Sequence, residues 1–169
     1  MDIRIAEAKD AKIIHDLMIR AFTEYKTMPA SSSALDETVQ SVTNDLNNGE
    51  KAMISYIDGI PCGVVRFELK EDALYFFRLS VAPEFQRRGI ARALLAKMEE
   101  YALQNGLRKI QCKVRMSVEK NMNLYKSAGY TQFSQSILEL NGVSLDVAWM
   151  EKELVPVIKG TSDLPVLNA

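Results

Sequence analysis

The hexapeptide Gln86-Arg87-Arg88-Gly89-Ile90-Ala91 determines the interpretation of this chain because of what stands on either side of it. The apolar run 74–81 precedes it and is typical of a buried strand. Apolar residues follow it at helical spacing, namely Leu94, Leu95, Met98 and Ala102. The first backbone N–H groups of a helix lack intrahelical partners, so a strand, a tight turn and a helix N-terminus together predict an anion site.

Glycine and arginine suit this turn to a phosphate or pyrophosphate. Gly89 has no Cβ, so the backbone can approach a ligand closely, and Arg87, Arg88 and Arg92 add positive charge. Neither the Gly-x-x-x-x-Gly-Lys-Ser/Thr string of nucleotide hydrolases nor the dinucleotide pattern Gly-x-Gly-x-x-Gly occurs. What remains is Gln/Arg-x-x-Gly-x-Gly/Ala after a strand that ends Leu-x-Val-x-Pro. The alternative is an ordinary strand-to-helix turn with exposed arginines.

Residues 79–91 resemble the acetyl-CoA-binding motif of the GCN5-related N-acetyltransferases (GNAT). The resemblance implies that the strand before the turn splays away from the next parallel strand. It also implies that Leu79, Ser80 and Val81 lie along the pantetheine arm, with a backbone N–H near Leu79 stabilising the oxyanion. The pyrophosphate would be bound by the turn, which comprises Gln86, Arg87, Arg88, Gly89, Ile90, Ala91 and Arg92. Leu79 and Val81 can also be read as core residues, and both interpretations can hold.

A second motif, residues 121–130, resembles the Leu-Tyr-x-x-x-Gly-Phe/Tyr segment of the same family. The resemblance makes Tyr125 the general acid that protonates the departing thiolate. A tyrosine titrates near ~10 and a thiol near ~8.5, so the phenol carries the required proton at pH 7. The alternative is that Tyr125 only packs on the preceding long helix, as we expect of Tyr130 in the core. The family often has Asn and Ala where this chain has Val118 and Asn121, so Asn121 would contact CoA from a shifted position.

Arg78 is the candidate substrate-binding residue, because it interrupts an apolar strand just before the acetyl-binding segment. An arginine in a cleft can bind a carboxylate in a bidentate manner, which suggests an amino-acid-like or carboxylated amine acceptor. Arg66 and Arg115 also lie on predicted strands near the centre of the sheet and could serve similarly. The alternative for Arg78 is an internal salt bridge with Glu68 or another acid. The loop 25–35 is expected to cover the acceptor side.

The general base is not assigned. Glu24 and Glu68 are candidates, although each is more often a solvated surface acid. His15, the single histidine, is more often structural in such a position. Cys62 and Cys112 have no visible His partner, so an acyl-enzyme is not expected.

The order of elements predicts an α+β fold like that of GNAT proteins, with three layers and a mixed central sheet of about seven strands flanked by about four helices. The predicted strands are 2–6, 51–57, 60–70, 74–81, 110–115, 130–140 and 143–154, and the predicted helices are 9–25, 35–47, 89–105 and 119–127. Residues 1–154 are expected to form a single domain. The tail 155–169 is either flexible or packed on a partner subunit.

Composition excludes several classes. The 169 residues are 47% hydrophobic and 25% charged with a net charge of −1, which argues against nucleic acid as a partner. No apolar run approaches the ~20 residues that cross a bilayer, and the N-terminus does not read as a signal peptide. Two cysteines without metal-ligand spacing predict no metal site and two buried thiols in the cytoplasm.

The sequence therefore predicts an acetyl-CoA-dependent N-acetyltransferase in which a primary amine, most simply on a small molecule, attacks the thioester directly. It does not identify the acceptor, for which an amino acid, an antibiotic, a polyamine, a protein N-terminus or a lysine stay open. Two other hypotheses are a CoA-binding regulatory module without turnover, and a structural partner whose tail exchanges between subunits. Dimers are common in the family, so a homodimer is an alternative to a monomer.

Overall fold

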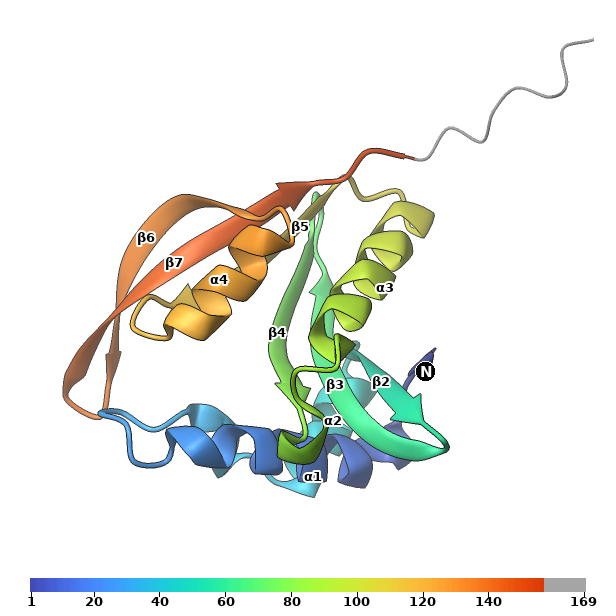
Figure 1. Ribbon diagram of the computed structural model, residues 1–169, viewed down its shortest axis with the longest axis horizontal. Coiled ribbons are helices and arrows are strands. Elements are labelled where there is room, and N and C mark those ends of the chain that lie inside the picture. The colour runs from blue at the N-terminus through green and yellow to red at the C-terminus, as the bar shows by residue number, and fades with distance from the viewer. Residues whose placement is uncertain (157–169) are drawn as a thin grey trace, which may run out of the picture.

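The computed structural model describes residues 1–156, which form a mixed seven-stranded sheet flanked by four α-helices (Figure 1). The sheet order is β1-β2-β3-β4-β5-β7-β6, and every neighbouring pair is antiparallel except β4 and β5. The strands are β1 (Asp2–Ile5), β2 (Lys51–Ile57), β3 (Ile60–Leu69), β4 (Leu74–Val81), β5 (Lys109–Arg115), β6 (Thr131–Leu140) and β7 (Val143–Glu153). The predicted fold class is confirmed.

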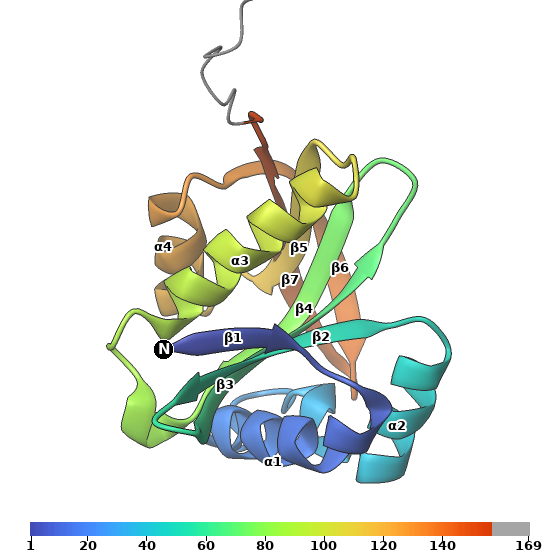
Figure 2. The same ribbon diagram turned by 90° about the vertical axis from the view of Figure 1, so that its right-hand side faces the viewer.

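The helices cover both faces of the sheet, which makes three layers (Figure 2). α1 (Ala11–Phe22) and α2 (Val39–Asn47) pack on one face, where Ile14 and Val42 join Val64 of β3 in one core cluster. α3 (Ile90–Gln104) and α4 (Glu119–Ser127) pack on the other, where Leu94 joins Val65 in a second cluster. Successive strand residues point to opposite faces, so Val64 and Val65 contribute to different cores.

Most predicted boundaries hold, and the differences have local causes. The predicted helix 9–25 is shorter as an α-helix, because 3₁₀ turns at Ala8–Asp10 and Thr23–Tyr25 flank α1. The predicted helix 35–47 begins only at Val39, where a capping box at Thr38 starts it: Ser41 N donates to Thr38 Oγ1 at 3.0 Å. The residues before it form a separate 3₁₀ turn, Ser33–Asp36.

Two irregularities of β4 shape the functional region. First, Val64 faces Ser80 and Arg66 faces Phe77, so one residue of β3 stands opposite Arg78 and Leu79 on β4. This is a β-bulge in β4, and Arg78 adopts a left-handed conformation with φ of 55°. Second, β4 pairs with β5 only over residues 74–76 and 110–112. Beyond that point the two strands separate, as the family resemblance implies, and leave a gap in the sheet.

A glycine on β3 brings α3 close to the sheet. A Cβ at Gly63 would lie 2.8 Å from Ile90 Cγ2 and 2.8 Å from Ser55 Oγ, which is too close for any larger residue. Ile90, the first residue of α3, is buried at this contact. Gly63 therefore fixes where the helix N-terminus sits relative to the gap.

No helix in the described part of the chain is both long and apolar enough to span a membrane. The predicted tail lies outside the described residues except for positions 155 and 156.

Candidate active site

The turn between β4 and α3 has the geometry of an anion site. Arg87 has φ of 61° and Gly89, the N-cap of α3, has φ of 78°, so two left-handed residues turn the chain sharply into the helix. The first helical hydrogen bond runs from Ala93 N to Gly89 O at 3.0 Å. The N–H groups that precede Ala93 have no acceptor within the helix, so they are available to an anion.

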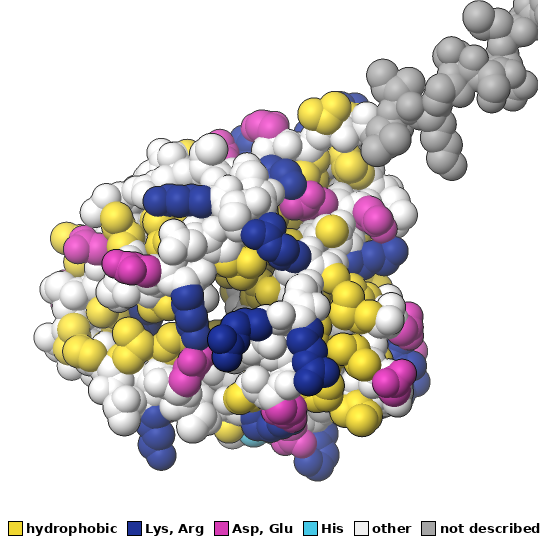
Figure 3. Space-filling model, viewed as in Figure 1, with side chains coloured by type: hydrophobic (Ala, Val, Ile, Leu, Met, Phe, Trp, Pro, Cys, Tyr) yellow, Lys and Arg dark blue, Asp and Glu magenta, His cyan; other side chains and the backbone are white. Residues whose placement is uncertain are grey.

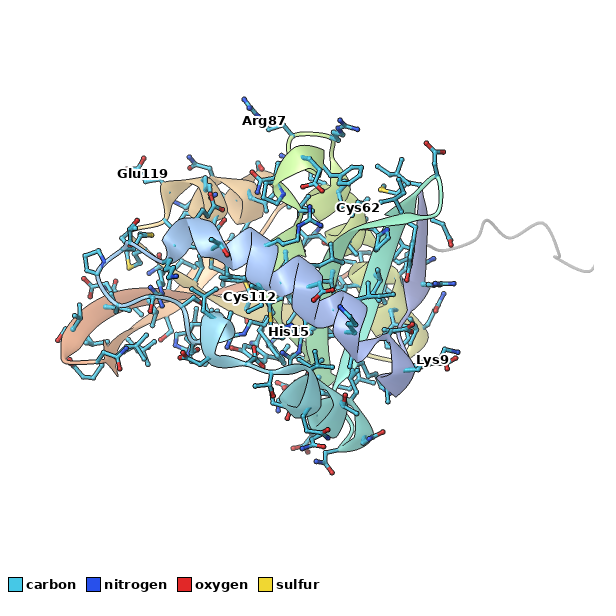
Figure 4. All side chains as sticks on the ribbon, turned by 90° about the horizontal axis from the view of Figure 1, so that it is seen from below. Lys9, His15, Cys62, Arg87, Cys112 and Glu119 are labelled. Carbon is cyan, nitrogen blue, oxygen red and sulfur yellow. The ribbon has the colours of Figure 1, made fainter. Side chains whose placement is uncertain are left out.

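The charged side chains of this turn are held mainly by neutral groups. Arg92 donates to the carbonyl oxygen of Ser127 at 3.4 Å and to its hydroxyl at 2.5 Å, and Arg88 stacks over the ring of Phe85 at 5.4 Å. Arg87 projects outward from the turn (Figure 4). Within residues 1–156 none of these three arginines is paired with a carboxylate. Their charge is therefore available to a phosphate.

A cavity of about 450 Å³ opens between this turn, β4 and α4. Figure 3 shows Lys and Arg side chains around a hollow near the middle of this face. With the exception of Arg88, every residue that the sequence predicted to bind CoA lines this cavity: Leu79, Ser80, Val81, Gln86, Arg87, Gly89, Ile90, Ala91, Arg92 and Asn121. Phe22 and Lys120 also line it and were not predicted, as do Glu24, a candidate base, and Tyr25, which begins the loop 25–35.

Tyr125 lies on α4 at the inner end of this cavity, with only 8% of its surface exposed. Its ring packs edge-on against Phe76, with 5.6 Å between the ring centroids. Burial, and next the nearby Cys112, raise the pKa of the Tyr125 hydroxyl well above its ordinary value. The hydroxyl therefore keeps its proton at neutral pH, as a general acid must. Tyr130 is 2% exposed and belongs to the core, as predicted.

A second cavity, of about 460 Å³, lies on the other side of Tyr125, in the gap between β4 and β5. Five residues line both cavities, namely Phe22, Tyr25, Leu79, Asn121 and Tyr125. The loop 25–35 contributes Tyr25, Ser32 and Ser33 to its wall, and the hairpin of β6 and β7 contributes Leu138, Leu140 and Val147. Tyr125 and Leu79 thus stand where the contents of two cavities would meet.

Arg78 lines the second cavity, and it also forms the internal salt bridge that was its alternative role. Its partner is Glu37 and not Glu68: Arg78 Nε donates to Glu37 Oε2 at 3.0 Å, while Glu68 pairs with Lys70. Arg78 Nη2 donates to Ser33 Oγ at 3.1 Å. No sequence pattern indicates Glu37 as the partner of Arg78, because Glu37 lies in a short polar segment before a helix.

Arg66 and His15 have structural positions. Arg66 is 1% exposed under α1 and α2, where it binds the carboxylates of Glu37, Asp45 and Glu50, so it does not reach either cavity. The idea that Arg66 could bind a substrate carboxylate is therefore wrong, because its guanidinium is already saturated with acids. His15 Nε2 lies 2.8 Å from the carbonyl oxygen of Glu37.

The remaining candidates show no assembled base or metal site. Glu24 lines the first cavity but pairs with Lys120 at 2.6 Å, and Glu68 lines neither cavity. Cys62 and Cys112 are buried free thiols, and burial raises the pKa of Cys112. Among the described residues no group of three His, Cys, Asp or Glu side chains could hold a metal ion.

The divided sheet, the anion turn and the buried tyrosine define an acyltransferase that takes a phosphate-bearing cosubstrate. The sequence model of the family described as "Acetyltransferase (GNAT) family" matches residues 13–130. The chain belongs to this family, whose cosubstrate is acetyl-CoA.

Solved structures share the fold. The acetyl-CoA complex of yncA, a putative acetyltransferase from Salmonella typhimurium, is 18% identical, with a TM-score of 0.75 over 96% of this chain and 99% of that chain. The ribosomal-protein-S18-alanine N-acetyltransferase of Escherichia coli is also 18% identical, with a TM-score of 0.75 over 96% and 98%. A spermidine N-acetyltransferase chimera from Vibrio cholerae and hSSAT is 23% identical, with a TM-score of 0.73 over 90% and 94%. At these identities the likeness concerns the fold alone.

Proposed function

We propose that this protein transfers an acetyl group from acetyl-CoA to the primary amine of a small molecule, by direct attack within a ternary complex. The observation that carries the proposal is the position of Tyr125 and Leu79 between two cavities of nearly equal volume, about 450 and 460 Å³. Acetyl-CoA supplies an activated acetyl thioester, and the first cavity has the chemistry to hold it. The second cavity is then left for the acceptor.

The residues of the first cavity fit the cosubstrate. Backbone N–H groups from Arg87 to the first turn of α3, with the side chains of Gln86 and Arg92, would hold the phosphates. The bulge takes Leu79 out of the regular β-ladder, so its amide is a candidate donor to the thioester carbonyl. Asn121 lines both cavities and is proposed to hydrogen-bond the pantetheine arm.

Tyr125 is the proposed general acid. As the acceptor nitrogen bonds to the acetyl carbon, the carbon–sulfur bond breaks and the sulfur takes the proton of the Tyr125 hydroxyl. The nitrogen gives up one proton to solvent, and the phenolate then regains one, so the proton count balances. Burial raises the pKa of the Tyr125 hydroxyl, so the group is protonated at neutral pH when the reaction begins.

Arg78 stays a proposed acceptor contact. Its Nε and Nη2 are engaged by Glu37 and Ser33, while its Nη1 has no hydrogen bond among residues 1–156. One edge of the guanidinium is thus open to the second cavity. The free thiols of Cys62 and Cys112 support a cytoplasmic setting, and a homodimer stays a prediction.

The test is release of CoA thiol from acetyl-CoA across a panel of small amines and amino acids, with Tyr125→Phe beside the wild type. The ring of phenylalanine preserves the packing on Phe76, so we expect unchanged acetyl-CoA binding by calorimetry and a turnover number lower by about 100-fold. Tyr101→Phe is the matched control, because Tyr101 lies on α3 against Phe67 and lines neither cavity. Unchanged turnover in Tyr125→Phe would contradict the proposed role.

The second candidate function is a CoA-binding module without turnover. Val118 favours it, because the N-cap of α4 has no side-chain hydrogen bond where relatives often carry Asn. Acetyl-CoA binding without thiol release in any member of the panel would make this module the better assignment.

A further inference from the structure

The second cavity is lined by charges of only one sign. Three cationic side chains line it, those of Arg78, Lys113 and Arg115, and no Asp or Glu does. Glu37 accepts a hydrogen bond from Arg78, but Glu37 does not line the cavity and its charge is shared with Arg66. The wall of this cavity therefore carries a net positive charge.

Lys113 is exposed and lies over the ring of Trp149 at 5.3 Å, and of the two partly buried arginines Arg115 is the one without a carboxylate partner among the described residues. Its Nη1 donates to the carbonyl oxygen of Ala30 at 2.6 Å and its Nη2 to that of Ser31 at 3.5 Å. Both acceptors are neutral, and no carboxylate pairs with Arg115 within residues 1–156. Burial and the neighbouring charge of Arg78 lower the pKa of Arg115, which shows that the surroundings disfavour its charge. A half-buried cation of this kind is stabilised when a ligand brings an anion.

The anion cannot be assigned to the phosphates of CoA. Arg115 and Lys113 line only the second cavity, while the first has its own cations in Arg87, Arg92 and Lys120. Tyr125 and Leu79 separate the two sets. The negative charge that matches Arg115 must therefore come from the acceptor.

We propose that the acceptor is a small primary amine that also carries a carboxylate, and that Arg115 is the residue that selects it. This inference rests on the proposed function, and it shifts the main anion contact from Arg78 to Arg115. A guanidinium offers a planar pair of donors that matches a carboxylate. Tyr75 and Phe77 of β4 provide an apolar wall for the body of the molecule. Polyamines are rejected, because their cations would face three others.

The experiment compares each standard amino acid with its α-amide and its decarboxylated amine, and adds spermidine. Binding to the CoA-saturated protein is measured by calorimetry, and thiol release from acetyl-CoA is measured in parallel. The wild type should bind at least one amino acid about 10- to 100-fold more tightly than its amide, the range expected for one charge-assisted bidentate contact. This comparison needs no variant, so it cannot fail through misfolding.

Arg115→Gln then tests the residue itself. The variant should raise the Kd and KM of the preferred amino acid by about 10- to 100-fold, remove the preference over the amide and leave the Kd of acetyl-CoA unchanged. Lys109→Gln is the matched control, because Lys109 lies on the same strand, pairs with Glu151 and Glu153 and lines neither cavity.

The outcomes separate the two proposals. Equal binding of acids, amides and spermidine, failure of every amino acid to bind, or a preference that survives in Arg115→Gln would overturn the inference. Thiol release only with amines that lack a carboxylate, spermidine included, would overturn this inference while keeping the proposed function. Selective binding of a carboxylated amine without thiol release would support the inference and overturn the proposed function.

Discussion

Two arginines of the central sheet, on β3 and β5, differ in whether carboxylates surround them. Arg66 on β3 is 1% exposed and binds the carboxylates of Glu37, Asp45 and Glu50. Arg115 on β5 binds only backbone carbonyl oxygens. A buried cation surrounded by acids holds α2 and its flanking loops to the sheet, whereas a cation without an acid remains available to a ligand. Charge balance, and not residue type, is therefore what distinguishes the structural Arg66 from Arg115, the arginine that we propose binds the acceptor.

Glu37 connects the two regions. Its Oε1 accepts from Arg66 Nη1 at 2.6 Å and its Oε2 accepts from Arg78 Nε at 3.0 Å. Its backbone oxygen lies 2.8 Å from His15 Nε2 on α1. One carboxylate thus serves the compensated cluster and the wall of the second cavity at the same time, so changes in either region are expected to reach the other through it.

The largest effect on the free energy of unfolding is expected from Arg66→Met, which removes the cation from the cluster of Glu37, Asp45 and Glu50. Methionine fills much of the volume, but it leaves Asp45 and Glu50 without their cationic partner and Glu37 with Arg78 alone. Removal of one partner from a buried ion pair costs about 3–5 kcal/mol, which lowers the melting temperature by about 10 °C or more in a chain of this size. Urea denaturation at pH 7 measures the loss. A loss below about 1 kcal/mol would show that the cluster contributes little.

The same variant has a predicted pH dependence. Burial raises the pKa of Glu50 above its usual 4.5, and the hydrogen bonds from Arg66 partly offset that rise. The folded state therefore binds more protons than the unfolded state, and stability falls as pH rises through the interval between the two pKa values. Without Arg66 the offset disappears, so the destabilisation of Arg66→Met should grow with pH and be smallest below about pH 4.5. Equal losses at pH 4 and pH 7 would contradict this account.

An intermediate effect is expected from Glu37→Gln, which removes charge from both regions at once. Arg66 retains Asp45 and Glu50, so the free energy of unfolding should fall by only about 1–3 kcal/mol. Arg78 loses its only carboxylate partner among the described residues, so the second cavity becomes more positive and should bind a carboxylated amine more tightly. Urea denaturation and calorimetry measure the two effects.

Glu68→Gln is the matched control for Glu37→Gln. Glu68 is an exposed acid whose partner is Lys70, and it lines neither cavity, so its variant should change stability by less than about 0.5 kcal/mol and binding not at all. Weaker binding of a carboxylated amine in Glu37→Gln would mean that Glu37 orients Arg78 and does not merely neutralise it.

Most of the fold could be predicted from local sequence patterns. Alternating apolar residues and glycine turns predicted β2, β4 and α4 with the bounds that the structure has. The bulge at Arg78 and the close contact at Gly63 were not predicted, because each depends on which strand or helix lies opposite. Such features are set by tertiary packing and leave no periodic signal in the chain.

The sequence predicts the part of the candidate site that short motifs form, but not the part that depends on residues distant in the chain. The turn at residues 86–91 and Tyr125 were predicted as site residues from two short motifs that resemble those of the family, and both line the first cavity. Arg66, Arg78 and Arg115 look alike in sequence, because each is a cation on a predicted strand near the centre of the sheet. They differ in the number of carboxylates that bind them, and these acids are distant in the chain: Glu37 lies 29 residues from Arg66 and 41 from Arg78. Ion pairs between residues so far apart in the chain could be identified only from the structure.

Apart from the control Glu68→Gln, the smallest effect on the free energy of unfolding is expected from Arg115→Gln, the variant of the arginine that has no carboxylate partner among the described residues. The variant weakens the hydrogen bonds to Ala30 and Ser31, but it also removes a half-buried charge that faces Arg78. These contributions oppose each other, so the free energy of unfolding should change by less than about 1 kcal/mol. Urea denaturation beside Arg66→Met, at the same pH and salt, measures the contrast. A loss as large as that of Arg66→Met would mean that Arg115 mainly anchors the loop at Ala30, and its lack of a carboxylate partner would then say nothing about the acceptor.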